Sequence, residues 1–124
     1  MARVMITLRR ARFTYASEDQ LQEGLAQLLA GDSHRVVREA RVSARDRVDL
    51  LIPEMHDGWG SVAIEVKVGG AAAAARRQVL RYTEHAEIGA VVLVTDRAYH
   101  AVRGALPEDA NGTRIYVHSL LASL

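Results

Sequence analysis

The chain is predicted to adopt an α/β fold, with a mixed central sheet flanked by helices in the order helix, three strands, helix, strand. Three stretches rich in β-branched and apolar residues follow one another at 35–42, 47–52 and 61–68. Segments with helical spacing lie on either side of them, and the continuous apolar run 91–94 is typical of a buried strand. A strand, a helix and a further strand in succession favour a crossover between parallel strands.

All 124 residues are expected to form a single domain, with its core at about 17–95. The absence of Cys excludes a disulfide framework, a Cys-zinc site and a thiol nucleophile. No apolar run approaches the roughly 18 residues of a membrane span. The segment 1–8 is too short and too interrupted for a signal peptide, so a cytoplasmic protein is expected.

The first predicted helix begins at Ser17, because a hydroxyl followed by acidic residues is typical of a helix start. Leucines then recur at helical spacing, at Leu21, Leu25, Leu28 and Leu29. Gly31 is expected to end this helix. Before it, residues 3–8 alternate weakly and predict a strand.

The second and third strands are expected to form a hairpin. Pro53 ends the second strand, and Asp57-Gly58 is a strong turn signal. On the third strand, alternation places Glu65 and Lys67 on one face. The other face belongs in the core and consists of Val62, Ile64, Val66 and Val68.

The second half of the chain continues with a helix at 71–86, after a break at Gly69-Gly70. A short helix is predicted at 97–105. The Asn111-Gly112 turn then leads into a last strand at 113–118.

Antiparallel pairing of the hairpin sets Asp49 across from residues 64–66, so two carboxylates and Lys67 gather at one place on the sheet. Two ionised carboxylates repel one another unless a cation lies between them. Lys67 is expected to supply part of that compensation, and Mg²⁺, which prefers carboxylate oxygens and water, the rest. The alternative to a functional site is an ordinary surface strand that carries a Glu–Lys pair.

This arrangement suits phosphodiester hydrolysis. Asp49 and Glu65 would hold the metal, with the Val66 carbonyl as a third ligand, and Mn²⁺ is expected to substitute for Mg²⁺. Lys67 would orient or deprotonate the attacking water and neutralise charge in the transition state. The chain has 15 Arg but only one Lys. A guanidinium transfers protons poorly, so an Arg could not replace Lys67 fully.

The runs Arg47-Val48-Asp49-Leu50-Leu51-Ile52 and Val62-Ala63-Ile64-Glu65-Val66-Lys67 resemble the PD-(D/E)XK nuclease superfamily. The resemblance extends over about 17–95, and its one departure is Val48 where the family often has Pro. It implies a restriction-endonuclease-like αβββαβ core and a Mg²⁺-dependent deoxyribonuclease without a small-molecule cofactor. By analogy with junction resolvases, a lone domain of this size would work as a homodimer. Its size suits a phage-encoded protein acting in the cytoplasm of a bacterial host cell.

Two further matches extend the resemblance. Such nucleases often offer an acid from the first helix to the metal, and Glu18 shares a face with the core leucines, whereas Glu23 does not. Gln78 and Tyr82 share a face of the 71–86 helix. This Gln-x-x-x-Tyr looks like the motif of helicase-linked and phage exonucleases, where the pair borders the active site. The alternatives are an acid favoured by the helix dipole and an ordinary Tyr anchor.

A basic rim around the carboxylates would bind DNA phosphates. Its candidate residues are Arg45, Arg47, Arg76, Arg77 and Arg81. The alternative for any one of them is a solvated surface that reflects the codon bias of a GC-rich genome. The five His residues show no metal-ligand spacing and are expected at the surface or in the hairpin.

The functional expectation is therefore a metal-dependent nuclease acting on DNA, selective for branched, flapped or end structures. Endonuclease and exonuclease action both stay open. One alternative is a non-catalytic DNA-binding or assembly module with the same fold, and another is a nuclease directed at RNA. Trp59, at the hairpin tip, could stack on a base, contact a dimer partner or fold back on the hairpin.

Overall fold

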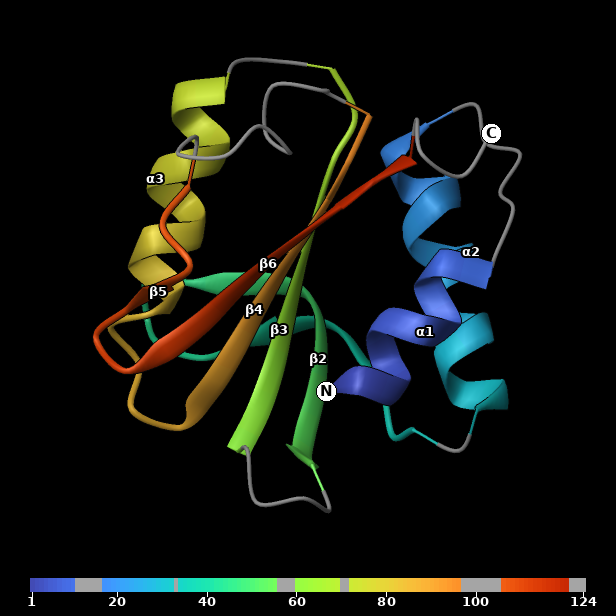
Figure 1. Ribbon diagram of the computed structural model, residues 1–124, viewed down its shortest axis with the longest axis horizontal. Helices are drawn as coiled ribbons and strands as arrows, with labels where there is room; N and C mark the ends of the chain where they lie inside the picture. The colour runs from blue at the N-terminus through green and yellow to red at the C-terminus, as the bar shows by residue number, and fades with distance from the viewer. Residues whose placement is uncertain (11–16, 33, 56–59, 70–71, 97–105, 121–124) are drawn as a thin grey trace.

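A computed structural model of the chain describes residues 1–10, 17–32, 34–55, 60–69, 72–96 and 106–120. Its helices are α1 (Ala2–Arg10), α2 (Glu18–Gly31) and α3 (Ala72–Tyr82). Its strands are β1 (Val37–Arg41), β2 (Arg47–Met55), β3 (Gly60–Lys67), β4 (Ile88–Thr95), β5 (Asp109–Ala110) and β6 (Thr113–Ser119). They form one sheet in the order β1-β2-β3-β4-β6-β5 (Figure 1).

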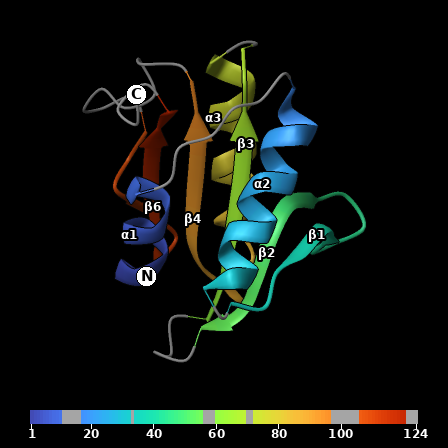
Figure 2. The same cartoon turned by 90° about the vertical axis from the view of Figure 1, so that its right-hand side faces the viewer.

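The sheet is mixed, and helices cover both of its faces. β1, β2 and β3 form an antiparallel meander, and α3 then crosses over to β4, which pairs parallel with β3 and with β6. Helices α1 and α2 lie on one face and α3 on the other (Figure 2). The α/β class and the predicted order of helix, three strands, helix and strand are confirmed.

Within the described residues, no helix combines the length and the apolar character that crossing a membrane requires.

Helix α2 forms as its sequence predicts. The Ser17 hydroxyl accepts a hydrogen bond from the Gln20 N–H at 3.2 Å, which satisfies one of the free donors of the first turn. Leu21, Leu25 and Leu29 are fully buried against the sheet. The helix extends to Gly31, and the next residue, Asp32, is its C-cap.

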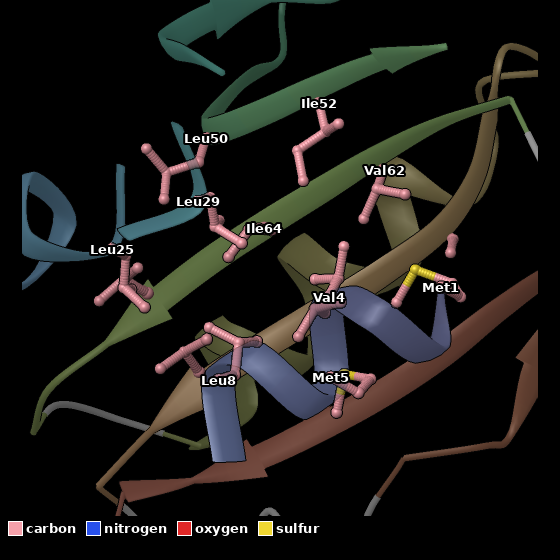
Figure 3. Packing of buried hydrophobic residues seen from close by; sticks show 14 of the residues in the cluster. Met1, Val4, Met5, Leu8, Leu25, Leu29, Leu50, Ile52, Val62 and Ile64 are labelled. Atoms are coloured by element: carbon pink, nitrogen blue, oxygen red, sulfur yellow. The ribbon is translucent and has the colours of Figure 1, made fainter. Parts of the chain in front are cut away.

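The strand predicted for residues 3–8 is wrong, because this segment is the helix α1. Its apolar residues Met1, Val4, Met5 and Leu8 recur at helical spacing and are all buried. Figure 3 shows them packed with Leu25 and Leu29 of α2 over the strands. In so short a segment, alternation and helical spacing overlap, and packing on the sheet decides between them.

The second strand does not end at Pro53 but continues to Met55. The last pair of the register between β1 and β2 joins Val37 to Leu51, so β1 requires no N–H donor from residue 53. The register between β2 and β3 also shifts between Ile52 and Met55. A proline is tolerated at such an irregularity.

Helix α3 ends at Tyr82, short of the predicted residue 86. After it, the N–H groups of Glu84 and His85 bond to carbonyls three residues back, in a tighter turn than an α-helix. The chain must then reach the start of β4 at Ile88, and this requirement limits how far the helix can extend.

The β2–β3 hairpin is confirmed by its pairing, whereas its Asp57-Gly58 turn and Trp59 lie outside the described residues. The helix predicted at 97–105 also lies outside them. The last strand is confirmed, and it pairs with the short β5 through Asn111 and Gly112. Both turn residues have positive φ, +53° and +81°, as a type I′ turn requires.

Strand β3 is buried on both faces. Val62, Ile64 and Val66 pack into the core beneath α1 and α2. Ala63 packs into a second core with Val79 and Tyr82 of α3. The face that carries Glu65 is therefore covered by a helix, which contradicts the alternative of an ordinary surface strand.

Candidate active site

Strands β2 and β3 part at the two predicted acids. The last pair of their common register joins Leu50 to Ile64, so Asp49 and Glu65 come next on the two strands. Meanwhile β2 stays paired with β1 down to Arg47, and β3 stays paired with β4 up to Lys67. We call the place between Asp49 and Glu65 the strand divergence. The predicted meeting of these two carboxylates is confirmed.

Glu65 is a buried acid beside a second acid. It is only 3% exposed. Burial, followed by the negative charge of Asp49 and a hydrogen bond between the two carboxyls, raises the pKa of Glu65 to about 9. Burial also raises the pKa of Asp49 above its ordinary value. Without a metal, Glu65 therefore holds a proton at neutral pH, and that proton relieves the repulsion between the two groups.

Tyr82 and Gln78 border this pair, as the resemblance implied. The Tyr82 hydroxyl lies 3.3 Å from Glu65 Oε1 and donates to the Arg47 carbonyl at 3.0 Å. Gln78 Nε2 donates to the same hydroxyl at 2.9 Å. Burial and the adjacent Glu65 raise the pKa of Tyr82, so its hydroxyl stays a donor. Gln78 thus orients the Tyr82 hydroxyl, which lies beside the Glu65 carboxyl at the strand divergence.

The Asp49 carboxylate accepts a hydrogen bond from a backbone N–H of β3 that is not paired with β2. The Val66 N–H donates to Asp49 Oδ2 at 2.8 Å, in place of a β2 carbonyl. A strand residue directs its N–H and its C=O towards the same neighbouring strand. The Val66 carbonyl, the predicted third ligand, therefore also faces the β2 side, beside the Asp49 carboxylate.

Glu18 reaches the same edge of β3. Its Oε1 accepts a hydrogen bond from the Val68 N–H at 2.8 Å, and its charge contributes to the raised pKa of Asp49. Val66 and Val68 are two residues apart, about 7 Å along a strand, and the Val66 carbonyl lies between their N–H groups. The prediction that Glu18 points toward the sheet is confirmed. Glu23 is exposed and pairs with Arg38 instead.

No three His, Asp or Glu side chains gather tightly enough to hold a metal among the residues that the structure describes. The Asp49 and Glu18 carboxylates accept from N–H groups two residues apart, those of Val66 and Val68. The donors close to one another are the Asp49 and Glu65 carboxylates and the Val66 carbonyl. Such a set fits Mg²⁺, which keeps several waters and takes only one or two carboxylates.

Lys67 lies at the end of β3, opposite Thr95 of β4, and is partly buried. It forms no ion pair with the acids of the described residues. The expectation that Lys67 compensates Asp49 and Glu65 directly is therefore wrong for this state, in which the proton on Glu65 has that role.

The five predicted DNA-binding arginines fall into two groups. Arg45, Arg76 and Arg77 are exposed. Arg47 is also exposed but pairs with Glu39 at 3.0 Å. Arg81 pairs with the buried Asp46. Because Arg47 and Arg81 each pair with a carboxylate, we leave both out of the proposed DNA surface.

Asp46 is a buried residue that sequence reasoning missed. It is 8% exposed and accepts hydrogen bonds from Arg81 and, at 2.9 Å, from His85 Nε2. These bonds, that of His85 first, hold the pKa of Asp46 below its ordinary value. The cluster ties the β1–β2 turn to the end of α3, beside Arg47 and Tyr82. The expectation that the His residues lie at the surface or in the hairpin is wrong for the buried His118, and His34 and His85 are half-buried.

No family model, no curated protein and no solved structure matches the chain. The interpretation of the strand divergence therefore depends on its residues and their contacts.

The proton on Glu65 predicts how stability depends on pH. Between the ordinary pKa of 4.5 and about 9, folded Glu65 keeps a proton that the unfolded chain has released. The free energy of unfolding should therefore fall as pH rises through this range, by at most about 1.4 kcal/mol per pH unit for one proton. Glu65→Gln should flatten that slope, because an amide mimics the protonated acid.

Chemical denaturation in EDTA between pH 7 and 8.5 measures this slope. The window lies above the titration of His118, whose pKa burial lowers. Glu84→Gln, at an exposed acid just after α3, is the matched control and should keep the wild-type slope. An unchanged slope in Glu65→Gln would show that the proton is held elsewhere.

Proposed function

We propose that this chain is a Mg²⁺-dependent deoxyribonuclease with a restriction-endonuclease-like core formed by α2, β1, β2, β3, α3 and β4. The observation that carries the proposal is the pair of carboxyls at the strand divergence, in which Glu65 is buried and Asp49 is half-buried. Glu65 lies two residues before the chain's single Lys. Burying two adjacent carboxyls is costly, and strongly shifted acids cluster at functional sites. A site that binds a cation accounts for this cost.

Asp49 and Glu65, with the Val66 carbonyl, would hold the metal. Once bound, Mg²⁺ would supply polarisation of the phosphate and acidification of the attacking water. Glu65 must give up its proton for this, so metal affinity should rise with pH. Glu18 has one oxygen on the Val68 N–H, and its other oxygen is available to a water at the site.

Lys67 would orient the attacking water. As the neutral amine it would take up the water's proton, or as the ammonium it would neutralise charge that develops on the phosphate. Its neighbours support this role, because Val66 and Val68 on either side are both held by carboxylates of the site. Gln78 and Tyr82 would keep Glu65 in place through the Tyr82 hydroxyl. All of these roles are assigned to groups at the end of β3 and on the side of α3 that packs against β3.

A non-catalytic module with the same fold is the rival proposal. Such a module has no need of a buried acid pair, and replacing Glu65 with an apolar residue would relieve the cost of burying it. The presence of Asp49, Glu65 and Lys67 together therefore favours the enzyme. A nuclease directed at RNA is the other alternative, and the test therefore includes RNA as well as DNA.

The proposed DNA surface comprises Arg45, Arg76 and Arg77, which are exposed on the β1–β2 turn and on α3. Arg77→Ala should reduce the slope of log affinity against log salt by about 1, as expected for one phosphate contact. Arg81→Ala should leave that slope unchanged. It should instead lower stability by about 1–3 kcal/mol, since it deprives Asp46 of a partner.

Fluorescence-anisotropy titrations with labelled DNA at four salt concentrations, together with thermal unfolding, separate these two expectations. A fall in the salt slope with Arg81→Ala would return that residue to the DNA surface. An unaltered slope with Arg77→Ala would remove Arg77 from it.

The test of the proposed function is incubation with Mg²⁺, Mn²⁺ or EDTA on linear, circular, single-stranded and branched DNA, with RNA in parallel. We expect metal-dependent cleavage of DNA, and the product pattern separates endonuclease from exonuclease action. Measuring the protein's mass in solution with the DNA bound tests the proposed homodimer. Binding without cleavage of any nucleic acid would favour the non-catalytic module, and cleavage of RNA alone would overturn the choice of substrate.

A further inference from the structure

The segment that carries Lys67 is held by carboxylates from both sides of β3. The Val66 and Val68 N–H groups face the β2 side and bond to Asp49 and Glu18. The next N–H along the chain, that of Gly69, donates to Asp96 Oδ1 at 3.0 Å. Asp96 directly follows Thr95, which is the β4 partner of Lys67 and is fully buried.

Lys67 is the last residue of β3, and the chain turns immediately after it. Gly69 has φ of +70°, in the left-handed region that glycine enters without strain. Strand ends followed by such turns open readily, because few backbone bonds hold them. A hydrogen bond from a backbone N–H to a charged carboxylate is stronger than one between neutral groups. Asp96 thus supplies, from the β4 side, the restraint that Glu18 supplies from the other side.

We propose that Asp96 is a positioning residue for Lys67, so that its carboxylate sets where the Lys67 amine lies by holding the Gly69 N–H. The inference rests on the proposed function for its effect on catalysis, but its geometric part can be tested without activity. Asp96 bonds to the β4 side of the Lys67 segment, away from the edge with Asp49 and Glu18, so we do not place it among the metal ligands.

The single Lys makes the geometric part measurable. An acylating reagent for amines can modify only Lys67 and the chain's N-terminal amine, and peptide mass spectrometry separates the two. Asp96→Ala should raise the acylation rate of Lys67 about tenfold, as loss of one charge-assisted bond allows. Asp96→Asn keeps an oxygen that accepts from the Gly69 N–H and should stay within about twofold of wild type. A short lysine-containing peptide added to each reaction serves as the reference for reagent concentration.

Asp32→Ala is the matched structural control. The Asp32 carboxylate accepts from Thr7 at 2.7 Å and pairs with Arg3, so it ties α1 to the end of α2, away from Lys67. Its loss should lower the unfolding midpoint and leave Lys67 acylation unchanged. Asp96→Ala should also lower the single-turnover cleavage rate about tenfold with the affinity for DNA unchanged, and Asp96→Asn should restore the rate.

Three results would overturn the inference. Lys67 acylation could be unaffected by Asp96→Ala, it could respond equally to Asp32→Ala, or Asp96→Asn could behave like Asp96→Ala. Failure of the proposed function has a different signature, in which the wild-type protein cleaves no nucleic acid. In that case the acylation rates still decide whether Asp96 positions Lys67.

Discussion

Lys67→Ala is expected to lower the rate of DNA cleavage by about 10²- to 10⁴-fold, the usual contribution of a positioned proton-transfer group. The side chain is partly buried at the end of β3 and forms no ion pair with the described acids. Its removal should therefore leave the unfolding midpoint and the affinity for DNA nearly unchanged. Single-turnover cleavage, thermal unfolding and DNA titration measure the three quantities.

Lys67→Arg is the informative companion to this variant. It preserves the positive charge but not the ability to transfer a proton at neutral pH. We expect it to retain DNA binding and to lose most turnover. Full activity in Lys67→Arg would mean that only charge is needed and that the single Lys reflects composition. Undiminished cleavage by Lys67→Ala would refute the mechanism.

Asp49→Asn is expected to abolish Mg²⁺-dependent cleavage and to weaken Mg²⁺ binding by at least about tenfold, since it removes one of two charged ligands. The amide oxygen of Asn can still accept from the Val66 N–H, so the fold should persist. Wild-type protein should unfold at a higher temperature in Mg²⁺ than in EDTA, and more so at pH 8 than at pH 6. Asp49→Asn should lose that difference.

Glu39→Gln is the matched control for Asp49→Asn. Glu39 lies opposite Asp49 on β1, between the pairs Arg38–Leu50 and Ala40–Val48, but it is exposed and bound to Arg47. Its charge is close enough to contribute to the raised pKa of Asp49. Metal-dependent stabilisation and cleavage should survive in Glu39→Gln. Cleavage that persists in EDTA would contradict the role of Asp49 as a ligand.

The predicted elements that were confirmed are those whose signals are local. The N-cap at Ser17 and the positive-φ turn at Asn111-Gly112 depend on a few adjacent residues. The alternation of residues 61–68 predicted the faces of β3 correctly, and the hairpin then predicted the meeting of Asp49 with Glu65. Helical spacing predicted that Gln78 and Tyr82 share a face of α3, whereas their place beside the acids was implied only by the resemblance.

The predictions that failed concern segments whose structure depends on packing or pairing with another element. Residues 3–8 have two compatible periodicities, and burial of Val4 and Leu8 on the sheet selects the helix. Pro53 stays in a strand because β1 does not extend far enough to need its donor. The helical expectation for 83–86 also fails, because the chain turns after Tyr82 to enter β4. Each outcome depends on a partner distant in the chain.

By itself, the sequence determined which residues could do chemistry: an Asp and a Glu on paired strands, and the chain's one Lys two residues beyond the Glu. Only the tertiary structure decided how they act. Helix α3 covers the face of β3 that carries Glu65, and burial raises the pKa of Glu65 so that it keeps a proton. The alternating pattern of one strand does not show whether a helix covers that face. The parting of β2 from β3 leaves the Val66 N–H to bond with the Asp49 carboxylate in place of a β2 carbonyl. The end of β4 brings Asp96 to the backbone beyond Lys67. Burial and backbone pairing are properties of packed layers, and for this reason local patterns do not contain them.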